Sequence, residues 1–229
     1  MKNNSLDRNL LQILAPKGYL RVAINLGNKV LAQKDPHSGV LSGLTVKLAS
    51  KLAVELNLDI RFIEYKAAGK VVHASQKDEW DIAFLAIDPL RAKSILFTKP
   101  YIIIEGAYMV RKSSTLKHAN EVDKNGTQIV VGKDAAYDLY LTRNLKEAEI
   151  LRAPTTTLAP SLFLEQNIEV LAGIKGPLID LASESSDLRV LDGIFMEIKQ
   201  AMALPLKSHE VKHIVDEFID DFIKSKIIN

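Results

Sequence analysis

The segment 209–213 reads His-Glu-Val-Lys-His, the one spacing in this sequence that matches a known catalytic motif. On a helix, two histidines four residues apart share a face and can bind zinc, and the glutamate between them can act as a general base. The apolar stripe of the surrounding segment, however, centres on Val211, Val215 and Phe218, and the histidines fall nearly opposite it. A zinc protease also needs a third protein ligand. We therefore expect no functional metal site and no hydrolysis here, and adventitious metal capture by the histidine pair is the alternative that stays open.

Other chemical signatures are absent from the sequence. The chain contains no cysteine, so disulfides, thiolate metal sites and cysteine nucleophiles are excluded. It has no phosphate-binding loop, dinucleotide fingerprint or serine-nucleophile motif, and the pair Gly132-Lys133 is too short a match for a phosphate site. We expect no cofactor.

The first half of the chain predicts alternating strands and helices. Strands are expected at 20–25, 59–65 and 80–86, helices at about 43–56 and 68–75, and a further helix opened by Asp88 as N-cap and Pro89 at its first position. A long extended segment follows at 101–110. The strands are continuously apolar, which is typical of a parallel sheet covered on both faces.

The second half of the chain repeats this pattern after the Asn125-Gly126 turn. Strands are expected at 128–132, 149–152 and 169–173, and helices at 135–145, at about 160–166 and from Pro177. Extended segments at 188–191 and 196–204 precede a closing amphipathic helix at about 208–227. We interpret the chain as an α/β protein of two lobes, whose default ligand site is the cleft between them.

Composition excludes several classes of function. The 229 residues are 47% hydrophobic and 25% charged, which is ordinary for a globular protein. The net charge is +2 and aromatic residues make up only 6%, so nucleic acid is not an expected partner. No apolar run approaches the roughly 18 residues of a membrane span, and the first residues lack the apolar core of a signal peptide.

Two adjacent stretches carry a family resemblance. They are Trp80–Arg91 (WDIAFLAIDPLR) and Ala92–Tyr101 (AKSILFTKPY), and segments 18–24 and 43–49 fit the same pattern. The chain resembles the family 3 bacterial solute-binding proteins, which are the polar amino-acid receptors of ABC importers. The resemblance covers nearly the whole chain and is clearest over residues 18–110.

This resemblance implies the two-lobe periplasmic-binding-protein fold of type II, in which each lobe is a mostly parallel sheet flanked by helices. Lobe one would comprise residues 1–108 and 202–229, and lobe two residues 109–201. Hinge strands would lie near 105–110 and 200–204, and the lobes would close on a small anionic or zwitterionic solute. We expect a monomer that serves a membrane transporter. The family implies a periplasmic location, whereas the absence of a signal peptide leaves a cytoplasmic one open.

The resemblance also implies ligand-binding residues in lobe one. Arg91 matches the arginine that binds a ligand's carboxylate, for which a planar guanidinium offers two parallel charge-assisted bonds. Asn28 occupies the position of a covering aromatic residue, and Ala86 and Asp88 the positions that accept from a ligand's ammonium. Asp88 is equally explained as a helix cap. At Ala68 a helix begins after the second strand and presents free N–H groups.

In lobe two, Ala135, Ala136 and Tyr137 match a helix start that faces the ligand's carboxylate. Lys175 stands where the family's receptors carry an aspartate for the ammonium, and a lysine cannot accept from an ammonium. Asp88 or Glu105 would then take that role, or the ligand has no amine.

Three functions follow in order of expectation. The first is non-catalytic binding of an amino acid or organic acid for an importer. The second is an enzyme of the same fold, a dehydratase acting on a small acid, for which Glu105 is the candidate general acid. The third is a cytoplasmic ligand-sensing domain.

Overall fold

The computed structural model describes residues 8–225 of the chain. These residues form two compact units, each with its own hydrophobic core. Unit 1 comprises the described residues up to Ile102 and again from Lys199, and unit 2 runs from Ile103 to Ile198. The chain therefore passes from one unit to the other twice.

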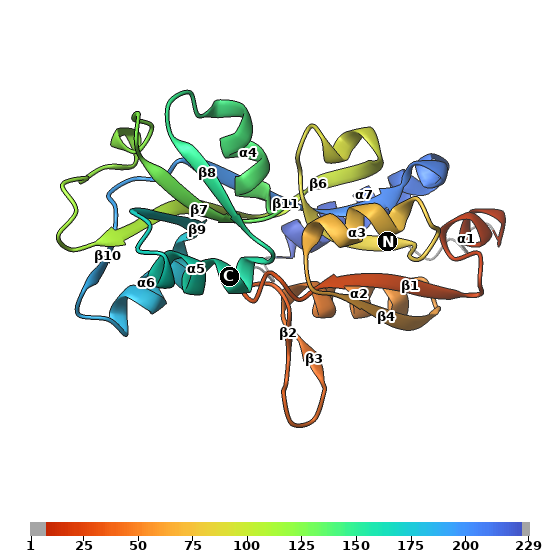
Figure 1. Cartoon of the computed structure of the whole chain (residues 1–229). Helices are drawn as coiled ribbons and strands as arrows, with labels where there is room; N and C mark the ends of the chain where they lie inside the picture. The colour runs from red at the N-terminus through yellow and green to blue at the C-terminus, as the bar shows by residue number, and fades with distance from the viewer. Residues whose placement is uncertain (1–7, 226–229) are drawn as a thin grey trace. The chain divides into compact units, whose positions relative to one another are not determined.

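Unit 1 contains the following elements (Figure 1): α1 (Arg8–Leu14), β1 (Tyr19–Asn25), β2 (Gln33–Lys34), β3 (Leu41–Ser42), α2 (Leu44–Glu55), β4 (Asp59–Tyr65), α3 (Ala68–Ser75), β5 (Ile82–Ala86), the short 3-10 helix η1 (Arg91–Lys93), η4 (Leu206–Val211) and α7 (Lys212–Lys224). The first part of β6 (Ile95–Arg111) and the last part of β11 (Met196–Pro205) also belong to it.

The sheet of unit 1 has the strand order β4-β1-β5-β11. Strands β4, β1 and β5 are parallel, and β11 runs antiparallel to β5. Side chains alternate between the two faces along each strand: Val22 of β1 packs with α2 and α7, whereas the adjacent Ala23 packs with α3. The helices thus cover both faces, which explains why the central strand β5 is apolar and buried at every position.

Unit 2 contains the rest of β6 and β11 and the following elements: η2 (Ala119–Glu121), β7 (Gln128–Gly132), α4 (Ala136–Asn144), β8 (Glu149–Ala153), η3 (Thr156–Leu158), α5 (Ala159–Glu165), β9 (Val170–Ile174), α6 (Lys175–Ser183) and β10 (Leu188–Val190). Its strand order is β6-β9-β7-β8, with β7, β8 and β9 parallel and β6 antiparallel to β9. Helices α5 and α6 share one core cluster, and Figure 1 shows α4 on the other side of that sheet.

The boundaries expected from the sequence, at 108/109 and 201/202, fall within β6 and β11. The structure divides the chain within the same two strands, at 102/103 and 198/199. Both passages between the units thus involve these two strands.

Three local predictions were wrong. Asp88 and Pro89 open no α-helix, because the chain must enter β6 at the buried Ile95 and only the three-residue η1 fits before it. The segment between β1 and α2, for which the sequence predicts no strand, contains the β2–β3 hairpin. The closing helix is interrupted: η4 includes the non-helical Ser208, and α7 begins only at Lys212.

An ion-pair network holds the amino-terminal ends of β1 and β5 together. Arg21 is 8% exposed, and its backbone N–H and Nε donate to Asp81 Oδ2 at 2.9 and 3.1 Å. Its Nη2 lies 2.6 Å from Asp81 Oδ1 and 3.0 Å from Asp78 Oδ1. Lys207 also donates to Asp78, and this ammonium, followed by Arg21, lowers the pKa of the Asp78 carboxyl. Asp78 therefore stabilises the fold at neutral pH, and that stabilisation is lost as the pH falls through its lowered pKa.

A second contact joins β6 to β11 within unit 1. The buried Thr98 Oγ1 accepts from the N–H of Met202 at 3.1 Å and lies 3.3 Å from the Met202 carbonyl oxygen. Pro100, two residues on, has no N–H to donate to a neighbouring strand. The Thr98 hydroxyl thus supplies side-chain hydrogen bonds close to a position where the backbone cannot donate.

We expect Asp81→Asn to lower the free energy of unfolding by about 3–5 kcal/mol, because it leaves the buried Arg21 without its main counter-charge. Asp78→Asn is the matched control: its side chain is 48% exposed, so its loss should cost about 1 kcal/mol or less. Urea denaturation of the two variants measures both. Equal losses of unfolding free energy in the two variants would show that burial of the Arg21–Asp81 pair does not determine how much it stabilises the fold.

We expect Thr98→Val, which keeps the shape of the side chain, to cost about 1–3 kcal/mol, because the buried Met202 N–H loses its acceptor. Thr98→Ser should retain most of the stability. The exposed Thr115→Val serves as a control. A Thr98→Val protein with the same urea midpoint as the parent would contradict a structural role for this hydroxyl.

Candidate functional site

The carboxyl ends of the parallel strands in unit 1 form the first candidate surface. The chain goes from β1 to β4 on one side of β1 and then to β5 on its other side, so β1 and β5 flank a topological switch point. Ligands in open α/β sheets bind at such points, outside the carboxyl ends of the strands. Residues predicted from the sequence follow all three strands there: Asn28 after β1, Ala68 after β4, and Ala86, Asp88 and Arg91 at and after β5.

The turn after β5 is built around Asp88 and Arg91, each 3% exposed. Asp88 Oδ1 accepts from the N–H of Leu90 at 2.8 Å and from that of Arg91 at 3.4 Å. Arg91 Nη1 donates to the carbonyl oxygen of Ala86 at 3.1 Å. The capping chemistry expected of Asp88 is thus present, but it closes a turn, and this turn fixes the guanidinium against the last residue of β5.

Asn28 lies in the loop after β1, and Ala68 begins the helix after β4; the two connecting segments approach each other closely. Asn28 Oδ1 accepts from the N–H of Val30 at 3.2 Å, so this side chain shapes its own turn. A Cβ on Gly27 would lie only 2.9 Å from the Lys66 carbonyl oxygen, which shows how closely the loops after β1 and β4 approach. Ala68 is the first residue of α3, whose start has no side-chain cap.

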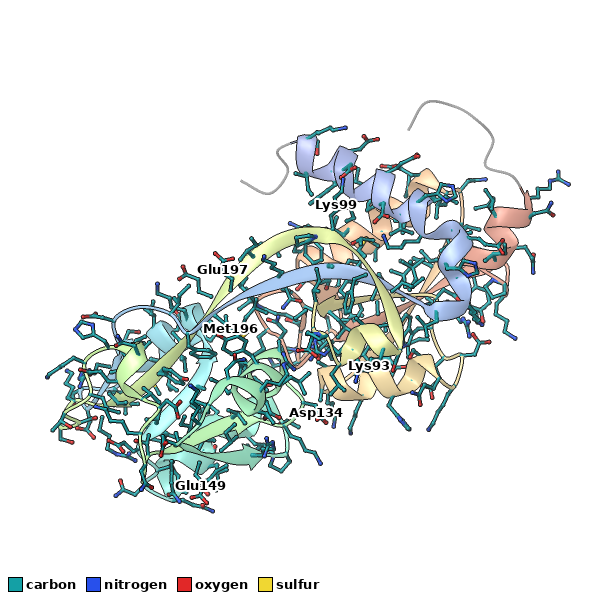
Figure 2. The ribbon with its side chains drawn as sticks, turned by 90° about the horizontal axis from the view of Figure 1, so that it is seen from above. Lys93, Lys99, Asp134, Glu149, Met196 and Glu197 are labelled. Atoms are coloured by element: carbon teal, nitrogen blue, oxygen red, sulfur yellow. The ribbon has the colours of Figure 1, made fainter. Side chains whose placement is uncertain are left out.

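The carboxyl ends of the strands in unit 2 form the second candidate surface. Ala135 is the N-cap of α4 and has no side-chain cap of its own. Asp134 before it, labelled in Figure 2, has a positive φ of 59°. Its N–H donates to Asp138 Oδ2 at 2.8 Å. The buried Asp138 also pairs with Arg152 Nε at 3.0 Å. The helix start at Ala135 and Ala136 is therefore fixed from within unit 2.

Tyr137 is part of this helix start but lies 3% exposed. Burial raises the pKa of its hydroxyl, and hydrogen bonds with the Thr156 side chain and the Gly132 backbone act in the opposite direction. A Cβ on Gly132 would lie 2.5 Å from the Thr156 Cα. Tyr137 thus joins the ends of β7 and β8, a positioning role that the sequence did not reveal.

Glu105 and Lys175 are brought together in unit 2. In the antiparallel ladder of β6 and β9, Gly106 pairs with Ile174, so the next residues along, Glu105 and Lys175, stand opposite each other. Lys175 Nζ donates to Glu105 Oε2 at 2.7 Å, and both side chains are partly exposed. Glu105 and Lys175, which the sequence analysis names as separate candidate ligand-binding residues, therefore form one ion pair at the carboxyl end of β9.

Thr155 and Thr156 were missed by the sequence analysis. They lie between β8 and α5, as Lys66 and Ala67 lie between β4 and α3, and Thr155 Oγ1 lies 2.9 Å from Thr157 Oγ1. The signal that could have found them is their place between a strand and a helix, at the same step of the repeated strand–helix order.

The segment 209–213 shows no sign of a metal centre. Its two histidines are exposed, as expected, but η4 and α7 place them on different helices, and His213 Nδ1 contacts the Glu210 carbonyl oxygen at 2.8 Å. Among residues 8–225 no cluster of three or more metal-binding side chains is found. In the same range no helix combines the length and hydrophobicity that a membrane crossing requires.

Solved structures share this fold. The arginine-bound ArgBP of T. maritima has 16% identity and a TM-score of 0.78, over 93% of this chain and 99% of that one. The ancestral amino acid-binding protein AncCDT-1, a precursor of cyclohexadienyl dehydratase, has 21% identity and a TM-score of 0.78, over 95% of each chain. A putative ABC-transporter binding component from Wolinella succinogenes, complexed with lysine, has 18% identity and a TM-score of 0.78, over 91% of each.

These structures confirm the predicted α/β fold class. A search of curated proteins finds no match to the chain. The family model for bacterial extracellular solute-binding proteins, family 3, matches residues 20–229, which include most of unit 1 and all of unit 2. The chain therefore belongs to the family 3 bacterial extracellular solute-binding proteins.

Proposed function

We propose that this protein binds a small carboxylate-bearing solute, an amino acid or an organic acid, as the substrate-binding component of an ABC-type importer. The observation that carries the proposal is the family match across both units. The similar proteins include an arginine-bound protein, a lysine-complexed transporter component and a cysteine-binding protein from Campylobacter jejuni. Their fold supports a solute-binding role, with a periplasmic location and a monomeric state as further parts of the proposal.

Arg91 is the proposed carboxylate-binding residue. It follows β5 at the topological switch point of unit 1, and its bond to the Ala86 carbonyl oxygen holds the guanidinium in one orientation. A planar guanidinium that is fixed before the ligand arrives loses less entropy on forming two parallel bonds. The starts of α3 and α4, at Ala68 and at Ala135 and Ala136, supply further N–H groups for an anion.

Closure is the second part of the proposal. Because the chain crosses between the units within β6 and within β11, we propose that the two units rotate about these strands and close on the solute. The solute would then contact the strand ends of both units.

An enzyme of the same fold is the second candidate, favoured by the similarity to the precursor of cyclohexadienyl dehydratase. Such an enzyme needs a general acid at the ligand. Glu105 accepts a hydrogen bond from Lys175 in this structure, so it would have to leave this partner to donate a proton. Turnover of prephenate by the purified protein would establish the enzyme; its absence, with binding retained, supports a binding protein.

We expect Arg91→Ala to weaken binding on the order of a hundredfold, because a charge-assisted pair is lost and the carboxylate stays desolvated. Arg91→Lys should recover only part of the affinity. The solute is first identified by a thermal-shift screen of amino and organic acids, and titration calorimetry then compares the variants.

Lys93→Ala is the matched control, since Lys93 is an exposed basic residue of the same short helix (Figure 2). It should bind like the parent. Circular dichroism establishes that each variant is folded. Unchanged affinity in a folded Arg91→Ala protein would remove Arg91 from the site.

We expect the radius of gyration from small-angle X-ray scattering to decrease when the identified solute is added at saturation, because the units close on it. Folded Arg91→Ala at the same solute concentration should keep the larger radius. A saturated parent protein with an unchanged scattering profile would argue against closure.

A further inference from the structure

Asp88 organises the turn that carries Arg91 in unit 1. Its Oδ1 accepts from the N–H of Leu90 at 2.8 Å and from the N–H of Arg91 at 3.4 Å. Its carbonyl oxygen accepts from the N–H of Ala92 at 2.9 Å. Asp88 thus bonds to Arg91 itself and to the residues before and after it, so the backbone of Arg91 is held by this one residue.

The turn is also fixed to the sheet. The N–H of Ile87 donates to the Lys199 carbonyl oxygen at 2.8 Å, which ties the start of the turn to β11. Pro89 has a φ angle that its ring locks. At the far end, Arg91 Nη1 donates to the Ala86 carbonyl oxygen at 3.1 Å. The orientation of the guanidinium therefore depends on a backbone that Asp88 closes and on a carbonyl group of β5.

The sequence left two roles open for Asp88, a cap and an acceptor for an ammonium of the solute. The structure makes these roles compete for the same oxygen. An ammonium that took Oδ1 would displace the N–H groups of Leu90 and Arg91, and the bond to Arg91 is buried. A buried N–H that loses its acceptor costs more free energy than an average hydrogen bond contributes. The capping role is therefore favoured over recognition of an amine.

We propose that Asp88 is a positioning residue, which holds Arg91 in the orientation that binds the solute's carboxylate and does not accept from an amine of the solute. This inference rests on the proposed function, in which Arg91 binds that carboxylate. Asp88 then acts on every carboxylate solute through Arg91, whether or not the solute carries an amine.

The first test compares solutes that differ only in the α-amine. Titration calorimetry uses L-alanine and propionate, L-leucine and 4-methylpentanoate, L-glutamate and glutarate, and L-lysine and 6-aminohexanoate. Asp88→Asn keeps a side-chain oxygen that can accept from the turn but removes the negative charge. The affinity for each solute that the parent binds should therefore stay within about threefold. A loss of about tenfold or more with either member of a pair would overturn the proposal.

The second test is a double-mutant cycle with Arg91. Asp88→Ala removes the acceptor and should weaken binding of each bound solute about tenfold, whereas Asp88→Ser restores a capping oxygen and should recover most of the affinity. In the Arg91→Ala background, Asp88→Ala should weaken binding by no more than about twofold further, because the group that it positions is absent. Circular dichroism establishes that each variant is folded. A folded Asp88→Ala protein with the parent's affinity, or an equal loss in both backgrounds, would contradict a role through Arg91.

Asp35→Ala is the matched control, because Asp35 Oδ1 also closes a turn of unit 1 by accepting from the N–H groups of His37 and Ser38 at 3.0 and 2.7 Å. It should leave all affinities unchanged. Binding that depends on Arg91 but not on Asp88 overturns the positioning role and leaves the proposed function standing. Absence of binding to the eight solutes and to the remaining L-amino acids overturns both.

Discussion

The parallel strands of each unit are bordered on one side by a strand that enters from the other unit. Strand β11 arrives from unit 2 and pairs with β5, and β6 arrives from unit 1 and pairs with β9. A parallel three-stranded sheet would otherwise leave β5 and β9 as open edges with unpaired backbone groups. The two crossing strands therefore cover these edges, and the Thr98 hydroxyl joins β6 to β11 close to Pro100, which cannot donate.

The two units share one topology, in which three parallel strands are bordered by one crossing strand. The orders β4-β1-β5-β11 and β8-β7-β9-β6 are equivalent, and both place a switch point beside the first strand of the unit. At both points a glycine admits the neighbouring loop: Gly27 faces the Lys66 carbonyl oxygen, and Gly132 faces the Thr156 Cα. The two strand-end surfaces are thus built alike although no repeat is visible in the sequence.

Local patterns predicted most elements because local and tertiary preferences agree there. The expected bounds of β4 at 59–65, α3 at 68–75 and β7 at 128–132 match the structure. The local patterns failed where tertiary structure overrides local preference. Asp88 and Pro89 carry good helix-start chemistry, but the chain has too few residues before β6. The even amphipathic pattern of the last segment hides the break at Ser208, because apolar spacing continues through it.

The sequence located side chains of the candidate site but not their partners. Glu105 and Lys175 are 70 residues apart, and only the register of β6 on β9 makes them a pair. Tyr137 was expected to contribute only its backbone N–H at a helix start; the structure adds that its side chain is buried and hydrogen-bonds to Thr156. Arg91 was assigned by family resemblance alone; the structure adds that one of its five N–H donors fixes it to Ala86. That bond, on a residue that is only 3% exposed, restrains the orientation of the guanidinium at the end of β5, because a buried side chain held by the last carbonyl of a strand cannot turn freely toward solvent.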